Sequence, residues 1–72
     1  MNRYLIIIEE TATGYSACSP DVPGCVATGR TRPEVETEMQ GAIEFHLDGL
    51  REEGLPIPKP SSTAEYVEVA VA

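Results

Sequence analysis

The run Ser19–Cys25 constrains this chain more than any other feature, because it holds two prolines and a glycine. Pro20 and Pro23 fix φ and lack the N–H that a sheet ladder needs. Gly24 can adopt a positive φ, and Asp21 can hydrogen bond within its own turn. The run therefore predicts a shaped connection between two strands, and excludes a continuous strand or helix there.

Short β-strands are predicted on both sides of this connection. Residues 3–10 are apolar on both faces, which is typical of a strand in the interior of a sheet. Residues 11–14 favour a turn, and residues 15–19 favour a half-exposed strand that returns antiparallel. Residues 25–29 predict a third strand at the sheet edge, which Gly29 ends.

A helix is predicted to follow, since Thr31 and Glu34 have the spacing of a capping box and Pro33 is tolerated in a first turn. Gly54 supplies the stop, and the prolines of residues 56–60 predict an extended segment after it. Apolar side chains recur at three- and four-residue spacing, which predicts one stripe that covers a sheet face: Val35, Met39, Ala42, Ile43, His46, Leu47 and Leu50.

Residues 64–71 alternate between valines and other side chains, which predicts a last strand with one buried face. Connection handedness brings this strand up parallel to the first strand and beside it. The predicted fold is a single α+β domain over residues 1–72, with the order βββαβ. Its mixed four-stranded sheet has the order 3-2-1-4, and one helix covers one face.

The other sheet face is left uncovered in this arrangement, so that Leu5 and Ile7, or Tyr4 and the side chains on its face of the strand, would be exposed in a monomer. Exposed apolar sheet surface in a domain this small favours association, and we predict a homo-oligomer. Tyr15 and Tyr66 are candidate interface anchors, because tyrosine is enriched at binding hot spots. Packing on a small sheet explains the two tyrosines equally well.

Charge restricts the class of partner. Twelve acidic and five basic residues give a net charge of −7. Such a chain is repelled by phosphate backbones, so we expect no direct nucleic-acid binding, and a basic protein is the better-matched partner. The same acidity would also serve simply to keep a small domain in solution.

No catalytic, metal or cofactor site is predicted. Cys18 and Cys25 lack the CxxC spacing, and His46 alone cannot complete a zinc site. The carboxylates do not converge from several elements as two-metal chemistry requires, so we predict a protein that is not an enzyme. A start at methionine without a signal-peptide pattern predicts a cytoplasmic protein with reduced thiols. The apolar run of residues 5–8 is too short to span a membrane.

The segment Pro20–Cys25, followed by Gly29 and Thr31, resembles the signature of the HicB-like antitoxin domain. The resemblance extends over most of the chain through the hydrophobic first strand, Gly14-Tyr15, Ala42-Ile43 and the run Gly54–Pro60. It implies a partial ribonuclease H-like fold and an antitoxin that binds a small basic, RNA-cleaving HicA-like toxin.

Two residues depart from the family pattern, namely Arg30, where an acidic residue is usual, and Pro33, where a helix former is common. Many family members continue into a helix-turn-helix or ribbon-helix-helix module that binds DNA. This sequence shows no such module, so we expect either a stand-alone HicB-like domain without it or a family role reduced to partner binding.

Under this resemblance, the toxin-binding surface is predicted on the exposed helix acids and on the proline-glycine connection: Asp21, Pro23, Gly24, Glu36, Glu44 and Asp48. The alternative hypothesis is a structural or regulatory module that self-assembles and has no toxin partner.

Overall fold

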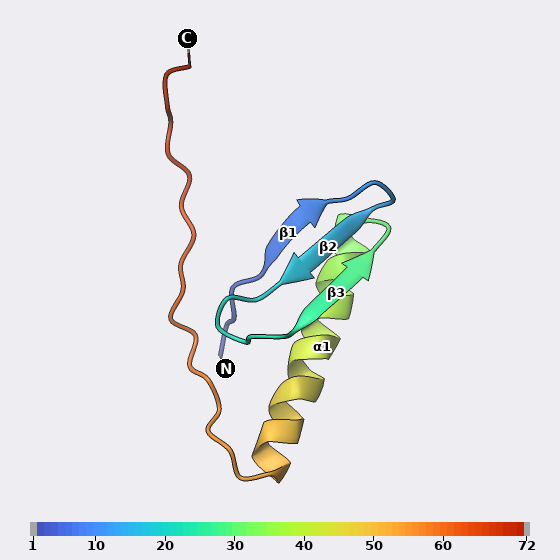
Figure 1. Cartoon of the computed structure of the whole chain (residues 1–72), viewed down its shortest axis with the longest axis vertical. Coiled ribbons are helices and arrows are strands. Elements are labelled where there is room, and N and C mark those ends of the chain that lie inside the picture. Colours follow the sequence, from blue (N-terminus) through green and yellow to red (C-terminus); the bar gives the residue numbers. More distant parts are fainter. Residues whose placement is uncertain (1, 72) are drawn as a thin grey trace.

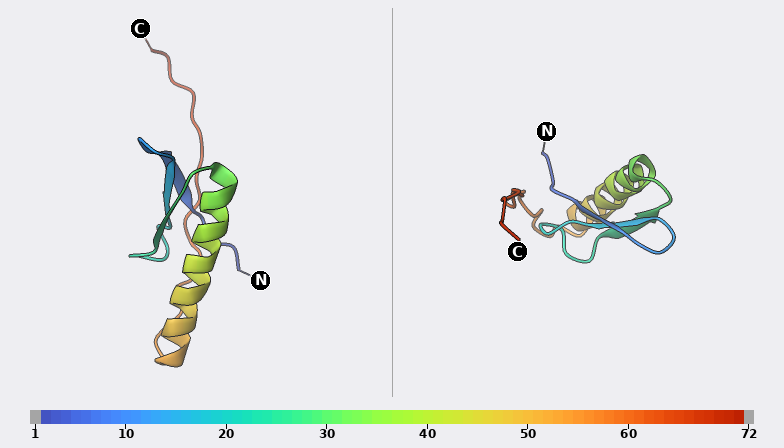
Figure 2. Two further views of the ribbon diagram at one scale, coloured as in Figure 1. Left: turned by 90° about the vertical axis from the view of Figure 1, so that its right-hand side faces the viewer. Right: turned by 90° about the horizontal axis from the view of Figure 1, so that it is seen from above.

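The computed structural model describes residues 2–71 as a three-stranded antiparallel sheet and one helix (Figure 1). The strands are β1 (Ile7–Glu10), β2 (Tyr15–Cys18) and β3 (Val26–Gly29), and they lie in the order β1-β2-β3. Helix α1 (Arg32–Glu52) lies across one face of the sheet, and the other face is uncovered (Figure 2). The α+β class and the succession βββα are therefore as the sequence predicts.

Strand register separates the two faces of the sheet. Ile8 lies opposite Ala17, and Ala17 lies opposite Ala27; Ile8 and Ala27 pack against the core, and Ala17 is part of it. The neighbouring row of Ile7, Cys18 and Val26 points to the uncovered face, because side chains alternate along a strand. β1 begins at Ile7 rather than at residue 3 as predicted, although Tyr4 and Ile6 still pack against the core.

Both ends of α1 carry the predicted signals. The Thr31 Oγ1 accepts a hydrogen bond from the Glu34 N–H at 3.2 Å, and the Glu34 carboxylate accepts one from the Arg30 N–H at 3.2 Å. Gly54 takes a φ of 70° after the last turn, and the Leu55 N–H donates to the Leu50 carbonyl at 2.9 Å. These bonds satisfy backbone groups that a helix end otherwise leaves unpaired.

The connection between β2 and β3 contributes to the core as well as reversing the chain. Val22 is fully buried and Cys25 is buried, alongside Val35, Met39 and Ile43 of α1. The Val22 N–H bonds the Ser19 carbonyl and the Cys25 N–H bonds the Val22 carbonyl, both at 3.2 Å. Gly24 has a φ of 83°, as its position in the turn requires. The predicted shaped connection is confirmed.

The sheet order β1-β2-β3 matches the 3-2-1 part of the predicted order, but residues 2–71 contain no fourth strand beside β1. Residues 64–71, here called the C-terminal arm, run away from the body as an extended segment (Figure 1). Tyr66 is 101% exposed, and the exposed fractions of Val67, Val69 and Val71 are 81%, 73% and 87%. β1 is consequently an edge strand and not an interior one. Alternation makes a segment able to form a strand, but a strand also needs a neighbour with which to pair.

β3 and α1 lie so close together at Gly29 that a larger residue at this position should destabilise the fold. A Cβ added at Gly29 would lie 2.7 Å from the Val35 backbone nitrogen and 2.9 Å from its Cα. Gly29→Ala should therefore lower the free energy of unfolding by ~1–3 kcal/mol, because the helix must shift. The matched control is Gly41→Ala on the exposed helix surface, where an added Cβ meets nothing within 4 Å. That variant should gain ~0.5–1 kcal/mol. Equal urea midpoints for the two variants would contradict the tight contact.

Candidate partner-binding surfaces

Asp21 joins the β2–β3 connection to a segment forty residues later in the chain. Its Oδ2 accepts hydrogen bonds from the Ser61 and Ser62 N–H groups, both at 3.0 Å. Its Oδ1 accepts from the Ser61 hydroxyl at 3.1 Å and from the Ser62 hydroxyl at 2.9 Å. We call this arrangement the Asp21 clamp. The prediction that Asp21 caps its own turn is wrong, because the hydrogen bonds to its carboxylate come from the two serines.

These hydrogen bonds hold the pKa of the Asp21 carboxyl below its usual value, and the Ser62 N–H is the largest cause. A lowered pKa means that the native state favours the charged carboxylate. The hydrogen bonds to the Asp21 carboxylate therefore stabilise the folded chain fully above the ordinary aspartate pKa. This stabilisation is lost as the pH falls through the lowered pKa of the folded state.

Two further hydrogen bonds hold the N-terminal residues beside the same region. The Tyr4 hydroxyl donates to the Pro58 carbonyl, and the Ser19 hydroxyl donates to the Leu5 carbonyl at 2.8 Å. Together with the Asp21 clamp, they place residues 58–62 next to residues 4–5 and the connection. The root of the C-terminal arm is thus fixed, although the arm itself projects outward.

The predicted acidic residues of α1 are all exposed. Glu44 accepts a hydrogen bond from the Gln40 side chain at 3.2 Å, and Asp48 pairs with Arg51 at 2.9 Å on the surface. α1 carries six carboxylates and two arginines in all, so its outer surface is acidic. The exposed ion pair contributes little to stability, since both partners are well hydrated.

The predicted binding residues fall on two separate surfaces. Pro23 and Gly24 are exposed at the tip of the connection, which projects from the sheet away from the helix (Figure 2). Glu36, Glu44 and Asp48 project from α1, on the other side of the sheet. A single partner of small size would contact one of these surfaces more readily than both.

The predicted interface residues are also distributed over different places. Ile7 is 43% exposed on the uncovered sheet face, and Leu5 is half-buried. Val26 on β3 is 68% exposed and is separated from Ile7 by Cys18 of β2, so the three side chains form one row across the sheet. Tyr15 packs against the core, whereas Tyr66 lies on the C-terminal arm.

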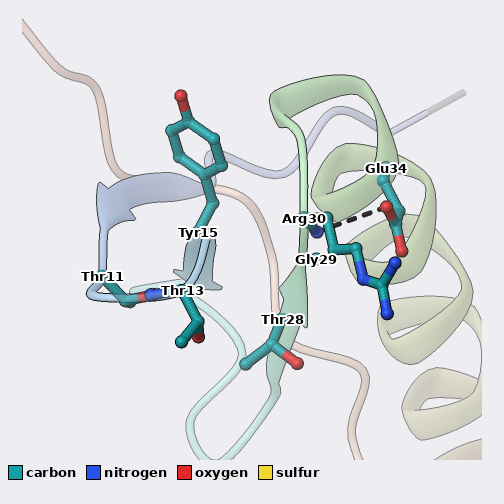
Figure 3. A pocket seen from close by; sticks show the side chains of 7 residues that line it. All are labelled: Thr11, Thr13, Tyr15, Thr28, Gly29, Arg30 and Glu34. Carbon is teal, nitrogen blue, oxygen red and sulfur yellow. Dashed lines mark hydrogen bonds between the residues drawn. The ribbon is translucent and has the colours of Figure 1, made fainter.

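A shallow pocket at the turn end of the sheet was not anticipated from the sequence. Figure 3 shows that its side chains come from the β1–β2 turn, the two following strands and the start of α1. Hydroxyl groups dominate the lining, which consists of Thr11, Thr13, Tyr15, Thr28, Gly29, Arg30 and Glu34. No local pattern could predict it, because these residues are brought together only by strand pairing.

Across residues 2–71, no three His, Cys, Asp or Glu side chains are grouped so that they could hold a metal ion. Burial raises the pKa of the Cys25 thiol, which keeps it protonated and weakly nucleophilic. Over the same residues, no helix has the length and apolarity needed to cross a membrane.

The Asp21 clamp can be tested by replacing its charge. In Asp21→Asn the ionic acceptor is lost, so the amide resonances of Ser61 and Ser62 should shift toward those of an unanchored segment at neutral pH. In the wild-type chain the same resonances should move as the pH is lowered below the ordinary aspartate value of 3.8, and the variant should be insensitive over that range. NMR titration provides the measurement, and Asp48→Asn on α1 is the control. Unaltered serine resonances in Asp21→Asn would contradict the clamp.

Comparison with known proteins identifies the family. Residues 4–70 match the model of the HicB_like antitoxin of bacterial toxin-antitoxin systems. A 14.9 kDa protein from the rep-hol intergenic region of Haemophilus phage HP1 is 38% identical over 64 residues, covering 89% of this chain and 48% of that protein. "Antitoxin HicB 2" of Photorhabdus laumondii is 35% identical over 68 residues, covering 93% of this chain and 49% of that protein. The chain thus spans about half the length of these two relatives.

Other relatives have a similar length to this chain. A UPF0150 protein of Helicobacter pylori is 33% identical over 67 residues, which cover 92% of this chain and 93% of that protein. Among solved structures, a chain of a HicA3 and HicB3 toxin-antitoxin complex superposes with a TM-score of 0.72 at 32% identity. That superposition covers 83% of this chain and 70% of the other. With nearly its whole length matched by the family model and by several relatives, this chain belongs to the HicB-like antitoxin family.

Proposed function

We propose that this chain is an antitoxin-type binding protein that neutralises a small basic, RNA-cleaving HicA-like toxin. The observation that carries the proposal is its similarity, in sequence and in fold, to a chain of a HicA3 and HicB3 toxin-antitoxin complex. Membership of the HicB-like family supports the same role. In this role the chain acts by covering a surface of the toxin.

Electrostatics supports a basic partner. The net charge is −7, and α1 presents six carboxylates against two arginines. A basic toxin that binds RNA must display a cationic surface, and an acidic helix is attracted to such a surface while RNA is displaced from it. Charge complementarity of this kind accelerates association more than it raises affinity. We place the contact on Glu36, Glu44 and Asp48, with Pro23 and Gly24 of the connection as the second candidate surface.

A binding role also fits the arrangement of the carboxylates. Glu9 and Glu10 end β1, whereas Glu36, Glu44 and Asp48 are exposed on α1. Phosphoryl chemistry with two metal ions would need several carboxylates around one point. We therefore propose that the chain is not an enzyme and that it works in the cytoplasm without a cofactor and without binding nucleic acid directly.

A second candidate function is a self-assembling structural or regulatory module that has no toxin partner. The observation that favours it is the apolar surface left exposed on the sheet and on the C-terminal arm. Homo-oligomer formation is compatible with both functions, so the presence of a toxin decides between them.

Co-expression tests the proposal directly. The chain is produced together with the product of the adjacent reading frame, and growth is compared with and without it. A toxic neighbour that co-purifies with the chain and is silenced by it would support the antitoxin function. A neighbour that is harmless and does not bind would overturn it in favour of the self-assembling module.

Charge reversal on α1 predicts a kinetic effect. In the triple variant Glu36→Lys, Glu44→Lys and Asp48→Lys, the association rate with the basic toxin at low salt should fall by about tenfold or more, while the dissociation rate changes less. Stopped-flow or surface plasmon resonance measures both rates.

The matched control changes the same number of charges elsewhere, in Glu9→Lys, Glu10→Lys and Glu65→Lys, all of which are exposed. If both triple variants slow association equally, the association rate depends on the net charge of the chain and not on the position of the charges on α1. If neither variant slows it, the helix does not form the toxin contact.

A further inference from the structure

The C-terminal arm has the properties of a strand that lacks a sheet. Its backbone is extended, and its valines alternate with Tyr66, Glu68 and Ala70. The three valines and Tyr66 are among the most exposed apolar side chains of the described chain. Extended apolar segments with unpaired backbone groups are templates for pairing with another strand.

The sheet has an unpaired edge at β1 that could accept such a strand. Between residues 2 and 71, β1 pairs with β2 alone, so its outer edge presents backbone N–H and C=O groups to solvent. Residues 5–8 are apolar on both faces, which is unusual for an edge strand. This edge therefore suits an additional apolar strand.

The position at which the C-terminal arm leaves the body determines which sheet edges the arm can reach. A hollow lined by residues 3–6 and 62–64 shows that the arm starts beside the approach to β1. The Asp21 clamp and the bond from Tyr4 to Pro58 fix the chain just before that point. Beyond Ala64 the arm diverges from its own β1 and projects from the body (Figures 1 and 2).

We propose that the C-terminal arm pairs with the β1 edge of a second copy of this chain, and that the exchange is reciprocal. The arm and the β1 edge both belong to this chain. In a twofold dimer each arm therefore pairs with the β1 edge of the other copy, and neither the arms nor the edges stay unpaired. Six residues of the arm, 66–71, extend for ~20 Å, which exceeds the ~13 Å of a four-residue strand such as β1. Each sheet then gains a fourth strand, and β1 becomes the interior strand that its sequence predicts.

Charge distinguishes this pairing from binding to a basic toxin. The arm carries Glu65 and Glu68, and β1 ends in Glu9 and Glu10, so the paired strands share one sign of charge. Salt screens like charges, and self-association should therefore strengthen as salt is added. Binding of a basic toxin should weaken under the same conditions. The inference does not rest on the antitoxin function, and its tests contain no toxin.

The first test measures the mass of the full chain by light scattering over a range of concentrations. The wild type should be a dimer, and Val67→Asp with Val69→Asp should weaken dimerisation by about tenfold or more, because two carboxylates would enter an apolar strand face. These valines make no core contact, so the far-UV circular dichroism of the double variant should be unchanged. The control is Phe45→Asp on α1, which is 83% exposed and should leave the dimer intact. A monomeric wild type, or a double variant that dimerises as the wild type does, would overturn the proposal.

The second test shows which chain supplies the arm. In a Cys18→Ser, Cys25→Ala background, one protein carries Glu9→Cys, and others each carry a single cysteine at one position from Tyr66 to Val71. Oxidation of the mixture should give covalent heterodimers for at least one arm position. Placing both cysteines in one chain and obtaining only cross-linked monomers would show that the arm folds onto its own β1, and would overturn the exchange. Failure of every arm position to cross-link in the mixture would do the same.

Discussion

Packing of α1 onto one sheet face is the interaction on which the rest of the structure depends. Val35, Met39 and Ile43 form the helix side of the core, and they are buried against Ala17, Val22 and Cys25. In a chain of 72 residues this one layer of contacts supplies most of the apolar burial. The close approach of Gly29 to the Val35 backbone brings β3 against the first turns of the helix. Both candidate surfaces are positioned by this packing, since one is the outer face of α1 and the other is the connection that delivers Val22 to the core.

The Asp21 clamp extends this small body to the C-terminal part of the chain. A proline-rich segment has few backbone donors and cannot join a helix, so it needs side-chain hydrogen bonds to be held in one place. Asp21 provides them by accepting four hydrogen bonds from Ser61 and Ser62. The segment that resembles the family signature therefore has two structural roles in this chain. It buries Val22, and it anchors the root of the C-terminal arm.

Acidity and exposed apolar surface point to two different kinds of contact. The carboxylates of α1 suit a basic partner that arrives by long-range attraction. The valines of the C-terminal arm and the apolar edge at β1 suit a neighbour that completes the sheet. The two surfaces are spatially distinct in this fold, so a HicB-like chain can self-associate and still present its acidic helix. Because the proposed toxin contact and the proposed self-association should respond oppositely to salt, the two can be distinguished in solution.

Local sequence signals determined the elements that depend on neighbouring residues. The capping pair Thr31 and Glu34, the stop at Gly54 and the positive φ of Gly24 follow from backbone chemistry within a few residues, and each was predictable. The family was also predictable, because its signature run and the further matching motifs along the chain are local sequence patterns. Tertiary structure alone decided where the hydrogen bonds of Asp21 go, since its partners lie forty residues away. Tertiary structure also decided whether residues 64–71 pair with a strand. Alternation makes this segment able to form a strand with one buried face, but the geometry of the whole chain determines which strand lies beside it.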